Sequence, residues 1–306
     1  MENNVKRIWF DTDIMIGLPE RAPREVDDGI TLMMALRQKN IEIAGISIIT
    51  NADYGYEVTQ KLLKWYHEGE PIPVFKGSDL ANDVGTENDA TLALADALRK
   101  EKLSILALGP MTNVATVLKN HPELASQIEE IAFCIGRTAD FEFKPGLETL
   151  IVSDYNFDKD VVSMKVILDT DIPLVYSGFE ASCSLFLGTI DFDRLNNNGH
   201  EGDQWVYEKL KHWSERGKGL FGVEGFIPYD VTPLGYFTHP GYFKCHENIP
   251  TQINVKSNYS PRDPRTEKEY LEVSYEFKSE RKVKFVYKTL PGFEEEVIKS
   301  LLRRDN

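Results

Sequence analysis

Short apolar runs and longer segments of helical periodicity alternate along most of the chain. The apolar runs, typical of buried strands, lie at 8–10, 41–50, 71–77, 103–109, 129–136 and 171–178. The segments with helical spacing of apolar residues lie at 30–36, 56–69, 90–100, 113–128, 160–168 and 201–219. Short connections with Gly and Pro separate them, and this alternation predicts a mostly parallel open sheet covered by helices.

The C-terminal part follows a different pattern. Apolar and polar residues alternate with a period of two at 251–257, 269–277 and 282–288, which indicates antiparallel strands with one exposed face. A last amphipathic helix is predicted at 292–304. Because no linker, low-complexity tract or internal repeat interrupts the chain, we expect one α/β domain over 1–306, with an antiparallel C-terminal extension.

Composition places the chain among globular proteins and excludes two classes of partner. Its 306 residues are 42% hydrophobic and 27% charged, and its net charge is -14. This charge argues against binding nucleic acid, whose phosphates require Lys and Arg patches, and against electrostatic attachment to anionic membranes. No apolar run reaches the length of about 18 residues that a membrane span needs. A polyanionic surface does favour the uptake of cations.

The cysteines predict neither a zinc site nor a disulfide framework. Cys134, Cys183 and Cys245 are odd in number, far apart and without a CxxC motif. Buried free thiols in a reducing compartment are the expected state. The N-terminal residues also lack the apolar core of a secretion signal. We therefore expect a cytoplasmic protein.

Four carboxylates gather at the first predicted strand-to-helix crossing. Asp11 and Asp13 end the first strand, and side chains two apart in a strand share one face. Asp27 and Asp28 stand where the next helix begins, a position that favours negative charge. Either pair alone could be an ordinary cap. Together they would repel one another unless a hard divalent cation with oxygen ligands neutralises them, so a metal or catalytic site is the favoured interpretation.

Further polar residues follow later strands and are open to two interpretations each. Thr112, after the strand at 103–109, could point a carbonyl or hydroxyl into the crevice or cap the next helix. Asp154 and Asn156 would share one face of an extended chain, where they could hold a sugar or form a surface turn. Asp230 stands at another helix start, where a capping role is the default.

Several motifs, in the same order along the chain, resemble the calcium-dependent nucleoside hydrolases of the inosine–uridine-preferring type. Asp11-Thr12-Asp13 and Asp27-Asp28 resemble the family's DxDxG(x)DD strand–loop–helix motif. The later matches are Asn51 (Gly-Asn element), Pro73–Gly77 (PVxxG), Leu108–Asn113 (TGALTN), Phe133–Gly136 (MGG), Asp154-Tyr155-Asn156 (E-F-N) and Tyr229-Asp230 (His-Asp). The resemblance spans residues 5 to about 240.

The resemblance implies a ribosyl hydrolase with a Ca²⁺ cofactor and a small-molecule nucleoside substrate. The implied Ca²⁺ ligands are Asp13, Asp28, Asp230 and the Thr112 carbonyl. The implied contacts to the substrate come from Asp27, Asp154 and Asn156, with Asn51 lining the same crevice. Asp13 would also take a proton from the water that attacks C1′. Members of the family are commonly dimers or tetramers, so the resemblance also implies a homo-oligomer.

This sequence departs from the family pattern in three places. The connection from Asp13 to Asp27 is longer and could reshape the pocket entrance or add substrate contacts. Tyr229 stands where many members have the His that protonates the leaving base. Tyr229 itself is the candidate catalytic donor here, although a phenol is a weak acid near neutral pH. An Asn upstream of the E-F-N triplet aligns with Glu148 or a neighbour. These changes concern substrate choice more than reaction class.

Two other functions are compatible with parts of the pattern. A magnesium-dependent phosphatase of the haloacid dehalogenase type also opens with a strand and DxD, which would make Asp11 the nucleophile. Met15, however, stands where that motif requires Thr or Val. The second alternative is a non-catalytic calcium- and ribose-binding homologue, for which the missing histidine is the main argument.

Overall fold

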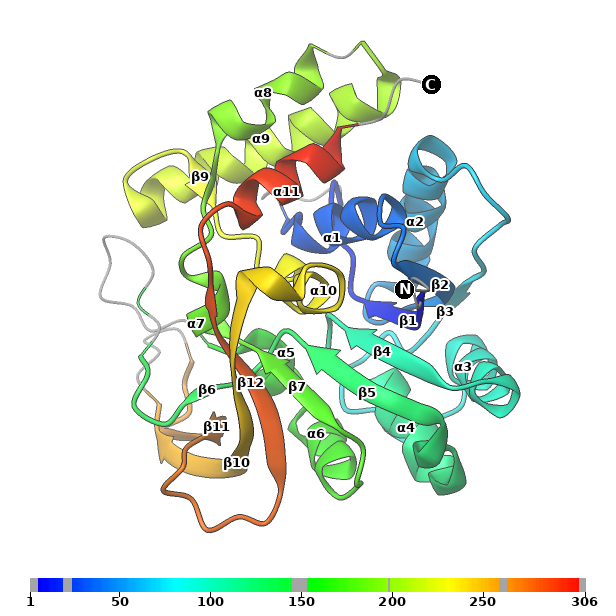
Figure 1. Cartoon of the computed structure of the whole chain (residues 1–306), viewed down its shortest axis with the longest axis vertical. Helices are drawn as coiled ribbons and strands as arrows, with labels where there is room; N and C mark the ends of the chain where they lie inside the picture. Colours follow the sequence, from blue (N-terminus) through cyan, green and yellow to red (C-terminus); the bar gives the residue numbers. More distant parts are fainter. Residues whose placement is uncertain are drawn as a thin grey trace.

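The computed structural model describes residues 5–18, 24–142, 144, 153–197, 199–258 and 263–302. Its centre is a ten-stranded sheet (Figure 1). From one edge to the other the strands are β3 (Val74–Lys76), β2 (Ile41–Ile48), β1 (Lys6–Thr12), β4 (Leu103–Ala107), β5 (Ile128–Phe133), β7 (Leu174–Ser177), β12 (Lys282–Thr289), β10 (Phe243–Ser257), β11 (Glu267–Val273) and β6 (Arg137–Thr138).

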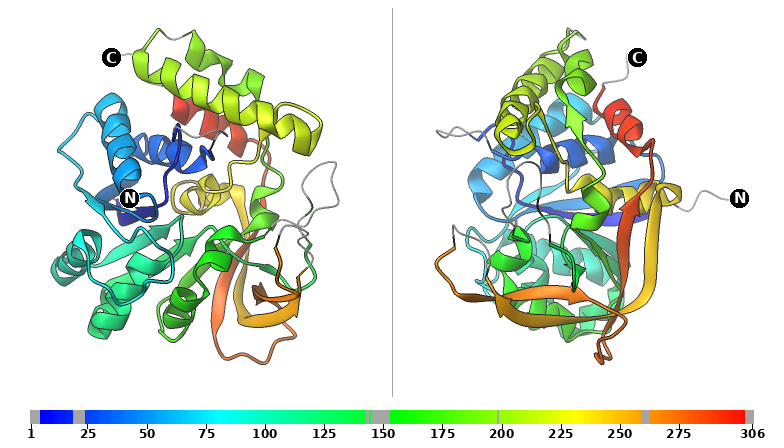
Figure 2. Two further views of the ribbon diagram at one scale, coloured as in Figure 1. Left: turned by 180° about the vertical axis from the view of Figure 1, so that it is seen from behind. Right: turned by 90° about the vertical axis from the view of Figure 1, so that its left-hand side faces the viewer.

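The strands from β3 to β12 run parallel to their neighbours, whereas β10 is antiparallel to both β12 and β11. The expected α/β fold, a mostly parallel sheet with an antiparallel C-terminal extension, is therefore confirmed. In Figure 2 the extension and helices α8 (Thr189–Asn196) and α9 (Glu201–Phe221) lie at opposite ends of the molecule. Within the described ranges every helix is too short or too polar to cross a membrane.

Helices cover both faces because the buried strands are apolar on both sides. On β1, Ile8 and Phe10 pack into one core and Trp9 into the other, as alternation along a strand requires. The first core is covered by α1 (Asp27–Leu36), α2 (Ala52–Tyr66), α10 (Val231–Thr238) and α11 (Phe293–Leu301). The second is covered by α3 (Asp89–Lys100), α4 (Thr112–Asn120) and α6 (Val161–Leu168) (Figure 1).

The strand order places a crevice at the carboxyl end of β1. The chain proceeds from β1 to β2 and β3 on one side, then crosses back to place β4 on the other side of β1. Connections that leave in opposite directions separate above the strand ends, and ligands of open α/β sheets bind there.

Three predicted elements differ from the structure. The helix expected over 113–128 is interrupted after Asn120, and η1 (Pro122–Gln127) follows, because a proline disfavours helical backbone at the residue before it. The strand expected from 251 begins at Phe243, since register shifts in β10 interrupt the alternation there. Asp154 and Asn156 do not lie on an extended chain: Asp154 is the N-cap of α5 (Tyr155–Lys159).

The cysteines are free, as expected, but they are not all buried. Cys183 is exposed, and Cys134 and Cys245 are half-buried.

Candidate active site

A pocket opens at the carboxyl ends of the parallel strands, with about 630 Å³ of space between its walls, including open solvent at the mouth. It is lined by Asp13, Glu25, Asp27, Asp28, Leu108, Cys134, Ile135, Gly136, Ser153, Asp154, Tyr155, Asn156, Gly178, Phe179, Tyr229 and Asp230. These residues come from the ends of β1, β4, β5 and β7 and from the starts of α1, α5 and α10.

Three buried carboxylates meet in this pocket. One oxygen each from Asp27, Asp28 and Asp230 lies within 4.8 Å of the others. Asp27 and Asp28 are in the first turn of α1, and Asp230 is the N-cap of α10, which packs against α1. The start of each helix favours negative charge. The structure therefore brings together acids that lie two hundred residues apart in the chain.

Asp13 lines the same pocket immediately after β1. Burial raises its pKa well above the ordinary value, and the carboxylates of Asp28, Glu25 and Asp27 raise it further. Burial also raises the pKa of Asp28 to about 6, although the Thr12 hydroxyl, which donates to Asp28, partly offsets this. Buried acids that raise one another's pKa values are strongly stabilised by a nearby cation.

The donor set fits a hard divalent cation. Around the pocket the described side chains with charge are all carboxylates, and Lys, Arg and His are absent from the described lining. Carboxylate and carbonyl oxygens are the ligands of Ca²⁺ and Mg²⁺. The three acids whose oxygens meet are Asp27, Asp28 and Asp230. Of the predicted ligands Asp13, Asp28 and Asp230, Asp13 lines the same pocket but is not part of this group, whereas Asp27, predicted as a substrate contact, is.

Asp11 lies outside the pocket lining and has a different environment. It is fully buried and accepts hydrogen bonds from the Ser47 hydroxyl and from Asn113 Nδ2 (2.9 Å). Trp9 Nε1 in turn donates to the Ser47 oxygen (2.8 Å). This network joins β1 to β2 and α4. Asp11 and Asp13 therefore do not act side by side, because β1 ends at Thr12 and the chain leaves the strand between them.

Thr112 does not line the pocket, whereas Leu108 does. Thr112 is buried in the first turn of α4, and its hydroxyl donates to Asp160 Oδ2. Leu108 follows β4 directly, and its carbonyl accepts a hydrogen bond from Asn156 Nδ2 (2.5 Å). The predicted residue Thr112 is therefore not at the pocket, and Leu108, at the start of the same turn, lines it instead. The strand-end position of Leu108 was the signal that could have identified it.

Asp154 and Asn156 both line the pocket. Asp154 Oδ2 accepts a hydrogen bond from the Gly136 N–H (2.6 Å). Burial raises the pKa of Asp154 to about 6, although the Arg137 guanidinium and the Gly136 N–H act in the opposite direction.

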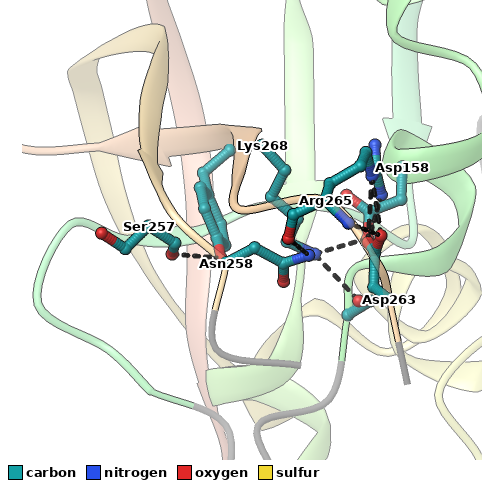
Figure 3. A network of polar contacts seen from close by, with 8 residues as sticks. Asp158, Ser257, Asn258, Asp263, Arg265 and Lys268 are labelled. Atoms are coloured by element: carbon teal, nitrogen blue, oxygen red, sulfur yellow. Dashed lines mark hydrogen bonds and ion pairs between the residues drawn. The ribbon is translucent and has the colours of Figure 1, made fainter. Parts of the chain in front are cut away.

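A polar network holds the segment that carries these two residues. Lys268 Nζ, on β11, donates to Ser153 Oγ (2.8 Å) and to Asp158 Oδ2 (2.6 Å). Figure 3 shows Lys268 and Asp158 beside Arg265 and Asp263, which pair with each other at the start of the same strand region. The antiparallel extension thereby fixes the position of α5 at the pocket.

Asn51 lies away from the pocket lining. It is exposed, has a left-handed backbone (φ 47°, ψ 43°) and is the N-cap of α2. Its Nδ2 lies 3.5 Å from the sulfur of Met15. Asn adopts this conformation more readily than most residues, so the local backbone accounts for its presence at this turn.

Tyr229 lines the pocket beside Phe179, with the two rings edge-to-face at 6.2 Å between centroids. Burial raises the pKa of Tyr229, and the carboxylates of Asp27 and Glu25 raise it further. Its phenol therefore stays protonated and is a poor proton donor.

The sequence analysis missed Glu25, Cys134 and Phe179 as pocket residues. Glu25 belongs to the long connection between Asp13 and Asp27, which thus contributes a residue to the pocket lining, and residues 19–23 of that connection lie outside the described ranges. Phe179 follows the end of β7, where the strand-end rule could have found it. Glu148, which aligned with a family Asn, also lies outside the described residues.

Comparison with known proteins decides the family. The family model described as inosine-uridine preferring nucleoside hydrolase matches residues 8–284. The chain belongs to this family. It is therefore a ribonucleoside hydrolase, an enzyme class that acts with a metal, and the haloacid dehalogenase-type alternative has no support.

Individual members of the family are distant relatives. The pyrimidine-specific ribonucleoside hydrolase RihB of Shigella sonnei is 21% identical over 268 residues, which cover 78% of this chain and 83% of that protein. Two solved structures share the fold. The purine-preferring ribonucleoside hydrolase of Gardnerella vaginalis is 16% identical with a TM-score of 0.74, covering 97% of this chain and 98% of its own. The inosine-uridine preferring enzyme of Bacillus anthracis is 14% identical with a TM-score of 0.68, covering 97% and 99%.

Proposed function

We propose that the chain hydrolyses the N-glycosidic bond of ribonucleosides to ribose and free base with Ca²⁺ as its cofactor. The observation that carries this proposal is the convergence of Asp27, Asp28 and Asp230 beside Asp13 in one pocket. The ligands would be the carboxylates of Asp13, Asp28 and Asp230 together with the Leu108 carbonyl, which takes the place first given to Thr112. Calcium accepts roughly six to eight oxygen ligands, so the set leaves positions for a sugar diol and water.

When bound, the cation would orient the ribose diol and make water more acidic, although less than zinc does. A carboxylate base beside the nucleophile is then useful, and Asp13 would accept the proton. Asp27 would hold one hydroxyl of the diol, while Asp154 and Asn156 would hold the remaining ribose hydroxyls. The ring of carboxylates would stabilise the positive charge that develops on the ribosyl group as the base departs.

Tyr229 would donate a hydrogen bond from its hydroxyl, and its ring would contact the nucleobase of the substrate. Its raised pKa makes it unsuited to protonate the leaving base. Asn51 receives no substrate contact in this proposal because it lies outside the pocket lining.

The direct test measures reducing sugar released from inosine, uridine, guanosine and cytidine, with Ca²⁺ present, after chelation, and after chelation with Ca²⁺ or Mg²⁺ restored. We expect ribose only with a divalent cation, and more with Ca²⁺ than with Mg²⁺. Calorimetric binding of a nucleoside without release of ribose over hours would instead favour the non-catalytic homologue. Full activity in chelator would contradict the metal assignment.

A further inference from the structure

Arg137 is a buried arginine directly behind the wall of the pocket. It lies on β6, is only 3% exposed, and follows Gly136, which lines the pocket. Its guanidinium carbon lies 5.1 Å from the centre of the Phe179 ring, another part of the lining, and 5.3 Å from the centre of the Tyr270 ring on β11. Two aromatic rings attract a flat guanidinium and hold it in place.

The two residues that flank Arg137 in the chain each bind a carboxylate. The Gly136 N–H donates to Asp154 Oδ2 (2.6 Å). On the other side, both the N–H and the hydroxyl of Thr138 donate to Glu180 Oε1 (2.8 Å each). Of these two acids, Asp154 lines the pocket and Glu180 does not. The segment 136–138 therefore places one guanidinium close to an acid of the pocket wall and to a second acid behind it.

The charge of Arg137 is not neutralised by a close bidentate pair. Its Nε and Nη2 are buried and have no hydrogen-bond partner in the described part of the chain. Arginine stays charged even when it is buried, and in a desolvated environment its field reaches groups beyond hydrogen-bonding distance. Burial raises the pKa values of the Asp154 and Glu180 carboxyls, and the Arg137 guanidinium acts in the opposite direction on both.

We propose that Arg137 is a positioning residue for sugar recognition, which keeps Asp154 in the charged form that binds the ribose 5′-hydroxyl. This inference rests on the proposed ribonucleoside hydrolysis, in which the cation and Asp27 take the 2′,3′-diol and the 5′-hydroxyl is left for Asp154 and Asn156. A charged carboxylate accepts a stronger hydrogen bond from a sugar hydroxyl than a neutral carboxyl does. Arg137 itself touches neither the sugar nor the cation in this role.

The first test uses Arg137→Met, which keeps most of the length of the side chain and removes its charge. The measured quantity is the ratio of kcat/KM for uridine to kcat/KM for 5′-deoxyuridine, each followed as release of reducing sugar. This ratio should fall about fivefold to tenfold in Arg137→Met, the difference between a charge-assisted and a neutral hydrogen bond. Arg137→Lys, which keeps the charge, should restore most of it. Arg7→Met removes an arginine that pairs with Glu42 and Glu101 outside the pocket lining, and it should leave the ratio unchanged.

The second test separates this role from a general contribution to folding. In Asp154→Asn the ratio should already be low, and adding Arg137→Met should not lower it further, because the arginine acts only through the carboxylate. Equal losses of kcat/KM for both substrates in Arg137→Met, or a further fall of the ratio in the double variant, would overturn the inference. If thermal unfolding shows that Arg137→Met does not fold, Arg137→Gln is judged by the same two outcomes.

Failure of this inference can be told apart from failure of the proposed function. Release of sugar from both substrates with a ratio that Arg137→Met leaves unchanged would overturn the role of Arg137 and leave ribonucleoside hydrolysis standing. Absence of sugar release from every nucleoside tested contradicts both.

Discussion

At the scale of single residues, burial changes the chemistry of the acids in the pocket. Asp13, Asp27 and Asp230 have pKa values well above the ordinary range because they are desolvated and repel neighbouring carboxylates. Asp154 lies farther along the pocket, where Arg137 and the Gly136 N–H partly offset its burial. A cation bound among Asp13, Asp27 and Asp230 would favour their charged forms, and a general base at Asp13 has to be charged.

Replacing Asp13 by Asn should reduce kcat/KM by about a hundredfold to ten-thousandfold, because the water loses its proton acceptor. Ribose release from inosine measures the effect. Asp169→Asn removes an exposed carboxylate that lies outside the pocket lining and serves as the matched control. Rates near wild type for Asp13→Asn would show that another group is the base.

The raised pKa of Asp154 predicts a pH dependence of stability in the metal-free protein. Its pKa is higher in the folded chain, about 6 against an ordinary 3.8, so the folded state binds more protons and the free energy of unfolding falls as the pH rises between these values. The free energy of unfolding of Asp154→Asn, measured relative to that of the wild type, should therefore increase by up to about 3 kcal/mol as the pH rises from about 4 to about 7. Urea unfolding in chelator measures this difference. A difference between Asp154→Asn and wild type that stays constant across that pH range would contradict the prediction. For the control Asp169→Asn we expect no such increase.

At the scale of secondary-structure elements, two helix starts and one strand position the acids. The first turns of α1 and α10 place Asp27, Asp28 and Asp230 together, and the end of β1 adds Asp13. Asp154 and Asn156 depend on α5, which β11 secures through Lys268 (Figure 3). The antiparallel extension, although remote in sequence from the acid motif, therefore supports the part of the pocket that Asp154 and Asn156 line.

Lys268→Met should destabilise the fold by about 3 kcal/mol because it leaves the largely buried Asp158 carboxylate without its partner. It should also raise KM more than it lowers kcat, since α5 loses its attachment. Urea unfolding and steady-state kinetics measure the two effects. Lys165→Met, which breaks an exposed pair with Glu269, should cost less than about 1 kcal/mol and serves as the comparison. Similar losses in the two variants would argue against a positioning role for Lys268.

At the scale of the whole molecule, the order of strands creates the crevice into which all these elements open. Beyond β12 the sheet continues with β10, β11 and β6, and the family match extends over the parallel part, through β10 and β11 and into β12. The extent of the domain over 1–306, the cytoplasmic location and the dimeric or tetrameric assembly stay predictions.

Binding of a divalent cation should stabilise the whole chain, because the unfolded state does not bring the acids together. Ca²⁺ at about one hundred times its dissociation constant should add about 2.7 kcal/mol to the free energy of unfolding. Thermal unfolding with Ca²⁺, with Mg²⁺ and with chelator measures this. Asp230→Asn should lose most of the response, whereas Asp169→Asn should keep it. A wild-type melting temperature insensitive to Ca²⁺ would contradict the proposed metal site.

The sequence by itself determined the class of fold, the position of the first acid motif and the family. These features depend on local information: apolar periodicity, strand ends followed by acids, and motifs in a characteristic order. It also placed Asp27, Asp28 and Asp230 at helix starts, where the local chain favours negative charge.

Only the tertiary structure decided which of these residues share one pocket. Whether Asp230 lies beside Asp28 depends on the packing of α10 against α1, which no local pattern specifies. The same holds for the separation of Asp11 from Asp13. Glu25 reaches the pocket through a connection without periodicity, so only the folded chain shows that it lines the pocket.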